Sequence, residues 1–406
     1  MSQPHDSAEA NVGVGPASAP VSLSRIAREW GRIGITGVGG PPTHIALLRR
    51  LCVEQRGWIA PSEFEDAIAT CNLLPGPAST QLAIWCGWQL RRRTGALIAG
   101  VCFIAPGLTL ILILSTLFLA AHPPLVVLGA AAGAGAAVPA VAVHAAWGLA
   151  PASWKRIHIG DTNRARAGHA RWIGYALLGG SAAALIGPYL VLILIACGLA
   201  EIAVRTRPVL PARPARAILP LVLPTAAATG GIAALAWEAF KVGALSYGGG
   251  FVIIPLMQHD AVHTYHWMTN TQFLDAVALG QVTPGPVVLT TAVVGFAAAG
   301  YAGALLAAAV AFSPSFAFVL LGARHFDALR HNTRIQAFLT GAGPAVIGAI
   351  AGSAIPLALA LAHGWQYILL PAAALWLLAA RRGVVSALLL SAVCGAGLAL
   401  AGVSAR

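Results

Sequence analysis

Two short stretches of the sequence place a glycine between two prolines, directly after an apolar run. The first is NLLPGP, which begins at Asn72, and the second is QVTPGP, which begins at Gln281. Proline removes a hydrogen bond from a helix, so each stretch predicts an interrupted helix. The helix that begins after such a break directs unpaired N–H groups and a partial positive charge at the break. This arrangement is suited to binding an anion.

The polar side chains near these breaks are mostly hydroxyls and amides, which can donate hydrogen bonds to an oxyanion without carrying a permanent charge. Two glycine-rich stretches, TGVGG from Thr36 and SYGGG from Ser246, precede the breaks and would allow the backbone to approach a ligand closely. We therefore expect the substrate-binding residues to be Thr36, Gly39, Gly40, Asn72, Pro75, Gly76, Pro77, Ser79, Lys241, Ser246, Gly248, Gly249, Gln281, Pro284, Gly285, Pro286 and Thr290.

The elements that hold these residues are expected to be helices in a membrane. The 406-residue chain is 58% hydrophobic and only 9% charged, whereas soluble proteins carry roughly 25% charged residues. The strand-like alternation of an outer-membrane barrel is missing from the sequence. The apolar runs that reach the roughly 20 residues needed to cross a bilayer are 95–121, 124–150, 301–322, 336–362 and 383–403. We predict an all-α polytopic membrane protein.

The sequence also repeats itself. Asp66 falls on Asp275, and Gly76 on Gly285, each 209 residues later, and the glycine-rich stretches recur in the same order. Transporters built from such repeats place the binding site between the halves, near the bilayer midplane. The predicted domains are a disordered tail at 1–22, a first repeat at 23–204, a basic cytoplasmic linker at 205–216 and a second repeat at 217–406.

The distribution of charge predicts how the two repeats are oriented. The net charge of +12 is attributed to membrane topology rather than to nucleic-acid binding, because basic residues gather in short loops on the cytoplasmic side. The runs 172–187 and 188–204 then form a hairpin, and a single crossing at 217–238 inverts the second copy. We expect two homologous halves in an inverted-topology repeat, with broken or re-entrant helices at the PGP motifs.

Ionisable residues at matched positions are candidates for coupling transport to protons. Arg32 and Lys241 precede the glycine-rich stretches, and Asp66 and Asp275 open the PGP segments. Ionisable groups within membrane segments are functional candidates by default. The alternatives are that the basic residues extend to the interface and that the carboxylates complement helix dipoles. We take Asp66, Asp275 and Arg32 as coupling candidates, and Lys241 as a residue that balances the charge of the substrate.

No cofactor and no metal site are expected. His259 and His263 have the i, i+4 spacing that can hold a metal on a helix, but the first half has no counterpart, so a solvated loop is the favoured interpretation. The six cysteines form no CxxC motif and are interpreted as small hydrophobic residues. The sequence also lacks the Walker A, HExxH and GxSxG motifs, which argues against ATP use and against an enzyme.

Taken as a set, these motifs resemble the chromate ion transporter family in its long, two-domain form. The matching stretches are GITGVGGP from Gly34, GALSYGGGFVIIPL from Gly243, NLLPGP from Asn72 and GQVTPGPV from Gly280. The resemblance covers about 25–200 and 235–400. The chain departs from the usual family pattern where Val38 and Tyr247 precede the glycine pairs, and where Asn72 replaces a glutamine.

The resemblance implies an exporter of chromate in the bacterial inner membrane, driven by the proton gradient and conferring chromate resistance. The implied partners are chromate or a similar oxyanion and the lipid bilayer, with no nucleic acid and with a homodimer left open. Sulfate or another oxyanion is the alternative substrate, since both are tetrahedral dianions. A membrane-embedded enzyme and a cation channel are the alternative classes of function.

Overall fold

The computed structural model describes the chain at residues 21–72, 74–120, 123–155, 157, 162–185, 190–205, 231–246, 253–323 and 332–403. Within these ranges all regular secondary structure is helical, which confirms the all-α prediction. Most of the predicted tail and linker lies outside the described residues. So do Gly248 and Gly249 of the predicted site.

The first bundle of the chain is built from short helices. These are α1 (Leu23–Thr36), α2 (Pro41–Arg49) with the π-helical turn η1 (Arg50–Gln55), α3 (Pro61–Cys71) and the first arm of α4 (Ala78–Phe118). α1 has 14 residues and is therefore about 21 Å long at 1.5 Å per residue. That length is less than the roughly 30 Å hydrocarbon core of a bilayer. Helix α1 is therefore shorter than a membrane-crossing helix.

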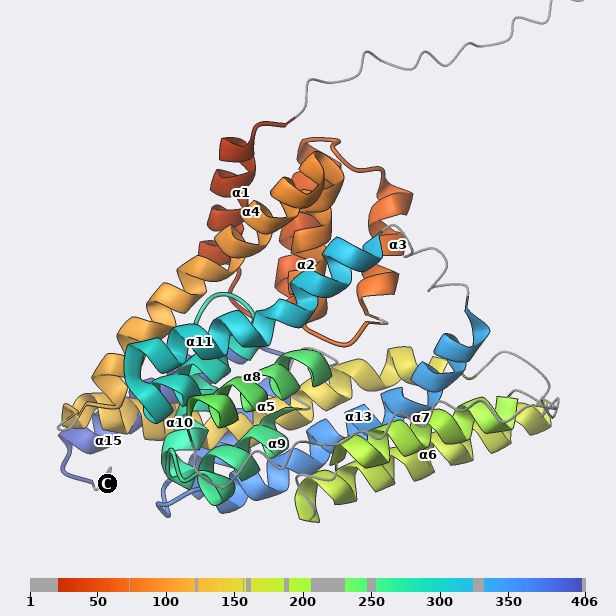
Figure 1. Cartoon of the computed structure of the whole chain (residues 1–406). Helices are drawn as coiled ribbons and strands as arrows, with labels where there is room; N and C mark the ends of the chain where they lie inside the picture. Colours follow the sequence, from red (N-terminus) through yellow and green to blue (C-terminus); the bar gives the residue numbers. More distant parts are fainter. Residues whose placement is uncertain are drawn as a thin grey trace, which may run out of the picture.

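Charged side chains gather at one end of this bundle. Arg49, at the end of α2, pairs with Glu65 near the start of α3, and Arg56 pairs with Glu29 of α1 at 3.2 Å. The glycine-rich segment before α2 and the PGP break after α3 lie at the other end of these helices, as Figure 1 shows for the red and orange helices. At both segments the chain reverses and returns toward the charged end.

Helix α4 folds back on itself. The backbone leaves the helical region at Arg91 (φ −145°, ψ 31°) and Arg92 (φ 49°, ψ −136°). The two arms then pack closely, because a Cβ placed on Gly87 would lie 2.5 Å from the carbonyl oxygen of Gly95. The single element Ala78–Phe118 is thus a helical hairpin with a short first arm and a long second arm.

The second bundle repeats this arrangement. It contains α8 (Ile232–Leu245), α9 (Ile254–Gln258), η4 (His259–Thr264), α10 (Asn270–Val282), η5 (Val287–Leu289) and α11 (Thr290–Gly322). Helices α1 and α8 begin 209 residues apart, as do the π-helical turns η1 and η4. Helix α11 reverses at Ala299 (φ −152°, ψ 31°) and Gly300 (φ 62°, ψ −150°), much as α4 does. The repeat in sequence is accompanied by a repeat of helix bounds and of backbone turns.

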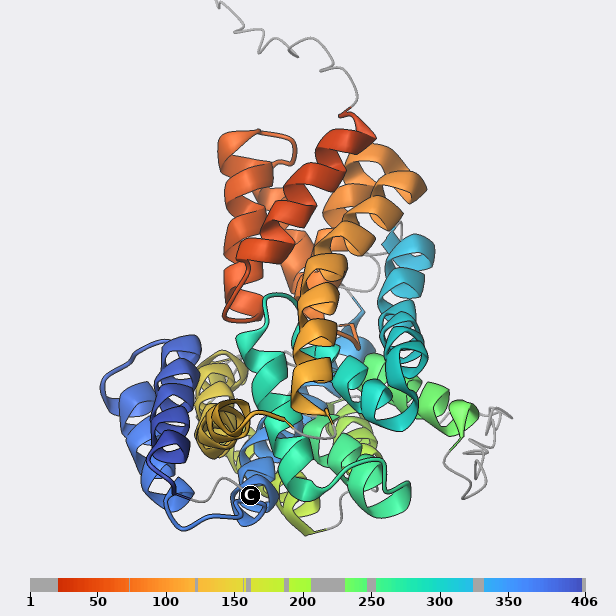
Figure 2. The ribbon, with the colours of Figure 1, turned by 90° about the vertical axis from the view of Figure 1, so that its left-hand side faces the viewer.

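Longer helices pack beside the two bundles (Figures 1 and 2). They are α5 (Leu125–Lys155), α6 (Thr162–Leu185), α7 (Leu190–Arg205), α13 (Thr333–Leu359), α14 (Gln366–Ala374) with the turn η7 (Leu375–Ala379), and α15 (Val384–Leu400). Helix α13 packs on α5, α6 and α7, while α14 and α15 pack on α5. Small residues make these contacts close: a Cβ on Gly133 would lie 2.1 Å from the carbonyl oxygen of Ser391. Such contacts are typical of helices in membranes.

Among the described residues, four helices are long and apolar enough to cross a membrane: Ala78–Phe118, Leu125–Lys155, Val287–Gly322 and Thr333–Leu359. The predicted runs fall on α4, α5, α11, α13 and α15, and the predicted hairpin falls on α6 and α7. The sequence analysis did not anticipate the shorter apolar helix Gln366–Ala379. Of the predicted crossing at 217–238, only the part from 231 onward is described, and it belongs to α8.

Candidate functional site

The two PGP breaks are tied to each other's halves by a reciprocal pair of hydrogen bonds. The N–H of Gly76 donates to the carbonyl oxygen of Ser246 at 2.7 Å, and the N–H of Gly285 donates to the carbonyl oxygen of Gly37 at 3.1 Å. Ser246 directly follows α8 and Gly37 directly follows α1. Each break therefore rests against the end of the first helix of the other half. We call these residues, with the prolines beside Gly76 and Gly285, the crossover.

The backbone at the crossover requires glycine. Gly76 has φ +116° and Gly285 has φ +109°, a region that side chains rarely tolerate. The surroundings leave no room either, because a Cβ on Gly76 would lie 2.5 Å from Nε2 of Gln81. On the other side, the carbonyl oxygen of Pro284 would lie 2.2 Å from a Cβ on Gly107. The two breaks thus fit between helices of both halves.

His44 holds the first glycine-rich segment in place. Its Nε2 lies 2.8 Å from the carbonyl oxygen of Gly37, and its Nδ1 lies 3.3 Å from Oγ of Ser79. Because a carbonyl oxygen only accepts, Nε2 carries the proton, and a neutral ring accepts the hydroxyl proton of Ser79 at Nδ1. The ring also meets Phe103 edge-on, at 5.0 Å between centroids. His44 is not among the residues that we expected at the site.

A group of buried hydroxyls without partners surrounds Gly76. Oγ of Ser246, Oγ of Ser315 and Oγ1 of Thr80 have no hydrogen-bond partner among the described residues, and all three side chains are fully buried. Oγ of Ser315 lies 3.1 Å from the position that a Cβ on Gly76 would take. Buried polar groups are almost always hydrogen-bonded. Hydroxyl groups that could donate to an oxyanion are therefore present at this break, on Ser246 and Ser315 beside Gly76 and on Thr80 at the start of α4.

The start of α4 adds a second feature that favours an anion. Thr80 lies in the first turn of α4, directly after the break. The N–H groups of Thr80 and Gln81 both donate to the carbonyl oxygen of Pro77, at 2.9 Å and 3.0 Å. The positive end of the helix dipole and the hydroxyls therefore converge on the same break.

The polar surroundings belong to one break only. The residue equivalent to Ser315 in the first half is Gly107, 208 residues earlier, and the residue equivalent to Thr80 in the second half is Leu289, 209 residues later. Both lie beside Gly285. A backbone arranged alike in the two halves thus carries hydroxyls at Gly76 and small or apolar side chains at Gly285. The residues in contact with the two breaks therefore differ.

A cavity of about 180 Å³ reaches the break at Gly76. It is bounded by the end of α3 and the start of α4, the end of α5 and one face of α13. Its polar lining comes from Asn72, Ser153 and Thr340. The cavity supplies space beside Gly76 that side chains of the described residues do not fill.

The crossover brings together much of the predicted site and leaves other parts away from it. Gly76, Ser79, Ser246 and Gly285 meet there, with the flanking Pro75, Pro77, Pro284 and Pro286. Thr290 is buried, but its hydroxyl donates to the carbonyl oxygen of Val287, and Nε2 of buried Gln281 has no partner among the described residues. Gly39 and Gly40 link α1 to α2. Thr36 is exposed and donates to the carbonyl oxygen of Arg32.

The structure changes the expectation for two backbone groups and one side chain. Sequence analysis assigned the N–H groups of Gly76 and Gly285 to an anion, but here both are engaged in the crossover. Lys241 was expected to balance the charge of the substrate, yet it forms ion pairs with Glu238 and Asp260. The pairing of Lys241 with Asp260 could not be predicted from the sequence, because the glycine-rich stretch separates the two residues.

The other coupling candidates occupy different environments. Asp275 is buried on α10, and its Oδ1 lies 2.8 Å from the position of a Cβ on Gly135 of α5. That oxygen has no hydrogen-bond partner among the described residues. Its counterpart Asp66 is half-buried and Arg32 is exposed. The carboxylate of Asp275 is therefore buried, whereas that of its counterpart Asp66 is partly accessible to water.

The histidine stretch is not the solvated loop that we expected. Residues His259–Thr264 form a π-helical turn in which Asp260 is buried. No group of three metal-ligating side chains occurs within the described part of the chain.

Comparison with known proteins places these features in a family. The family model described as chromate transporter matches residues 24–202 and 233–399. The chromate transport protein of Cupriavidus metallidurans is 30% identical over 345 residues, 83% of each chain. That of Pseudomonas aeruginosa is 31% identical over 345 residues, covering 84% of this chain and 82% of the relative. The probable chromate transport protein of Synechococcus elongatus is 28% identical over 351 residues. No solved structure matches the chain.

The contacts of His44 predict a measurable effect on stability. The substitution His44→Leu removes a donor to Gly37 and leaves the buried hydroxyl of Ser79 unpaired, so we expect a loss of about 1–3 kcal/mol. His44→Gln keeps an amide donor and should lose less. The measurement is thermal unfolding of the purified protein in detergent, followed by tryptophan fluorescence. Equal unfolding temperatures for His44→Leu and the wild type would contradict the role assigned to His44.

Proposed function

The chain belongs to the chromate transporter family, and from this premise we propose that it is a secondary active transporter of chromate with the anion bound at the crossover. The family supports an oxyanion substrate, and the apolar helices fit a multi-pass membrane protein. The site itself, the direction of transport and the energy source are the parts that we propose.

The observation that carries the proposal is the group of buried, unpaired hydroxyls around Gly76. Chromate is a tetrahedral dianion whose four oxygens accept hydrogen bonds. Ser246 after the end of α8, Ser315 of α11 and Thr80 of α4 supply hydroxyl donors at this break. Hydrogen bonds to a charged acceptor are roughly twice as strong as neutral ones. They offset part of the cost of removing the anion from water.

The reciprocal hydrogen bonds suggest how the site opens. In the structure, the N–H groups of Gly76 and Gly285 hold the two halves together. If the halves move apart, both N–H groups lose their carbonyl partners and become available to an anion near the midplane. Inverted repeats that rock about a central site work in this way. We propose that the two halves are inverted copies and that the anion takes over the bond to Gly76 during the cycle.

We propose export across the bacterial inner membrane, driven by the proton gradient and conferring chromate resistance. Basic residues at the turn of α4, Arg91, Arg92 and Arg93, would raise the local concentration of a dianion on the cytoplasmic side. Asp275 remains a coupling candidate because it is buried. We propose that the substrate is transported without chemical change. The oligomeric state is not part of this proposal.

Sulfate is the competing substrate. Chromate and sulfate have the same shape and charge, and hydroxyl donors do not distinguish them. Nothing in the arrangement of Ser246, Ser315 and Thr80 selects one over the other. Competition between the two anions therefore has to be measured.

The first test is transport itself. Everted membrane vesicles that contain the protein should accumulate labelled chromate when a pH gradient is imposed, and accumulation should fall when the gradient is removed. Gly76→Leu places a side chain against Gln81 and Ser315 and should abolish uptake while the protein is still made. Normal uptake by Gly76→Leu would refute binding at the crossover. Stronger competition by sulfate than by unlabelled chromate would reassign the substrate.

The second test concerns one hydroxyl. Ser315→Ala removes a single donor beside Gly76, and a hydrogen bond to a charged group contributes about 1.5–3 kcal/mol. The chromate concentration at half-maximal uptake should therefore rise about 10- to 100-fold. The matched control is Ser313→Ala on the same helix, because Ser313 is exposed and donates to the carbonyl oxygen of Val310. An equal effect of the two substitutions would exclude Ser315 from the site.

A further inference from the structure

Three ionisable side chains meet in the second bundle, away from the crossover. Lys241 of α8 pairs with Glu238 of the same helix, at 2.6 Å between Nζ and Oε2, and with Asp260 of η4. Glu238 is 2% exposed and Asp260 is 6% exposed. Oε1 of Glu238 has no hydrogen-bond partner among the described residues. We call Glu238, Lys241 and Asp260 the carboxylate triad.

The carboxylate triad carries one more negative than positive charge when all three groups are ionised. An uncompensated buried charge is costly, and the usual remedy is that a group changes its protonation state. The other titratable groups that face the triad do not remove the excess: His259 and Tyr265 lie beside Asp260, and His263 lies beside His259. One proton bound at Oε1 of Glu238 would make the triad neutral.

The equivalent place in the first bundle is already balanced. Glu29, 209 residues before Glu238, pairs one-to-one with Arg56 at 3.2 Å. The residue equivalent to Asp260 is Leu51, and the residue equivalent to Lys241 is Arg32, which is exposed. The same helix position thus holds a neutral ion pair in one half and an excess carboxylate in the other. This difference supplies a matched control within the chain.

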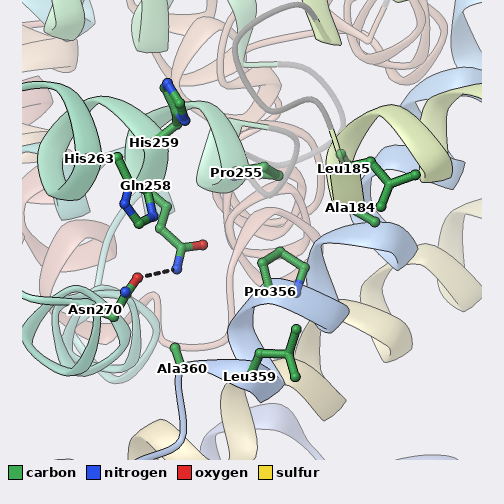
Figure 3. Close-up of a pocket in the computed structure, with 11 residues that line it drawn as sticks. Ala184, Leu185, Pro255, Gln258, His259, His263, Asn270, Pro356, Leu359 and Ala360 are labelled. Carbon is green, nitrogen blue, oxygen red and sulfur yellow. Dashed lines mark hydrogen bonds between the residues drawn. The ribbon is translucent and has the colours of Figure 1, made fainter.

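A cavity adjoins the turn η4, which carries Asp260 of the carboxylate triad. The cavity has a volume of about 340 Å³ and is lined by Gln258, His259, His263 and Asn270, with apolar residues of α6 and α13 opposite. Figure 3 shows the two imidazoles on the same side of the cavity, above the hydrogen bond from Gln258 to Asn270 at 3.0 Å. His259 directly precedes Asp260 in the chain. The cavity therefore brings two imidazoles to the turn that holds Asp260, while the triad itself does not line it.

From this geometry we infer that the carboxylate triad is the proton-binding site that couples the transporter to the proton gradient. This inference rests on the proposed function. Oε1 of Glu238 takes up one proton, and its O–H bond forms as an O–H bond of a hydronium ion breaks and leaves water. The Lys241–Asp260 ion pair persists, and the reverse steps return the proton to water.

The placement on α8 connects the proton to the crossover. Glu238 and Lys241 lie on the helix that ends at Leu245, and the carbonyl oxygen of the next residue, Ser246, accepts the hydrogen bond from Gly76. A change of charge at Glu238 alters the ion pairs that connect α8 to η4 through Lys241. It therefore biases whether Ser246 stays in the crossover, which is the contact between the halves that must open.

The test separates proton coupling from substrate binding. In vesicles, Glu238→Gln should no longer respond to an imposed pH gradient, while exchange of labelled for unlabelled chromate across the membrane remains measurable. Glu29→Gln, the matched control, should keep the response to the gradient. Retention of the full response in both Glu238→Gln and Asp260→Asn would overturn the inference. So would loss of the response in Asp275→Asn alone.

A second readout does not depend on chromate or on transport. Infrared difference spectra of the purified protein on acidification should contain the C=O stretch of a protonated carboxyl group that Glu238→Gln removes and Glu29→Gln keeps. If Glu238→Gln folds poorly, Asp260→Asn should shift the same band. A wild-type protein that shows the band but moves no chromate would refute the proposed function and support the proton site. An unchanged band in Glu238→Gln would overturn the proton site.

Discussion

The structure depends on one constraint: a backbone that breaks its helix inside a membrane must find new hydrogen-bond partners, because lipid offers none. Here each half provides the partner for the other. The N–H of Gly76 bonds to Ser246 and the N–H of Gly285 bonds to Gly37, so neither break is satisfied within its own half. This requirement brings two segments that are distant in the sequence to one place. It also makes the contact between the halves the natural point of motion.

The two halves share a backbone arrangement but carry different side chains at equivalent positions. Helix bounds, π-helical turns and hairpin reversals recur at nearly constant spacing. By contrast, unpaired hydroxyls lie at the Gly76 break, whereas Gly107 and Leu289 lie beside Gly285. Glu238 shares Lys241 with Asp260, whereas its counterpart Glu29 pairs with Arg56. We interpret the common backbone as the device for opening and closing, and the differences as the anion site and the proton site.

Much of this arrangement could be predicted from the sequence, and the limits have physical causes. The long helices follow from the length of the apolar runs, and the interruptions at Gly76 and Gly285 follow from the prolines that flank each glycine. The hydrogen-bond partners of Gly76 and Gly285 could not be predicted, because they are backbone carbonyl oxygens, which every residue carries. Ser315 was missed since it lies within an ordinary apolar run. Lys241 was assigned to the substrate because its partner Asp260 comes from a different helix.

The central claim is that the break at Gly76 binds the anion, and a single-particle structure determined with chromate tests it most directly. The account predicts density for one tetrahedral anion within hydrogen-bond distance of Ser246, Ser315 and Thr80, and none beside Gly285. Density for the anion at another place, or two PGP breaks that lie apart from each other, would contradict it.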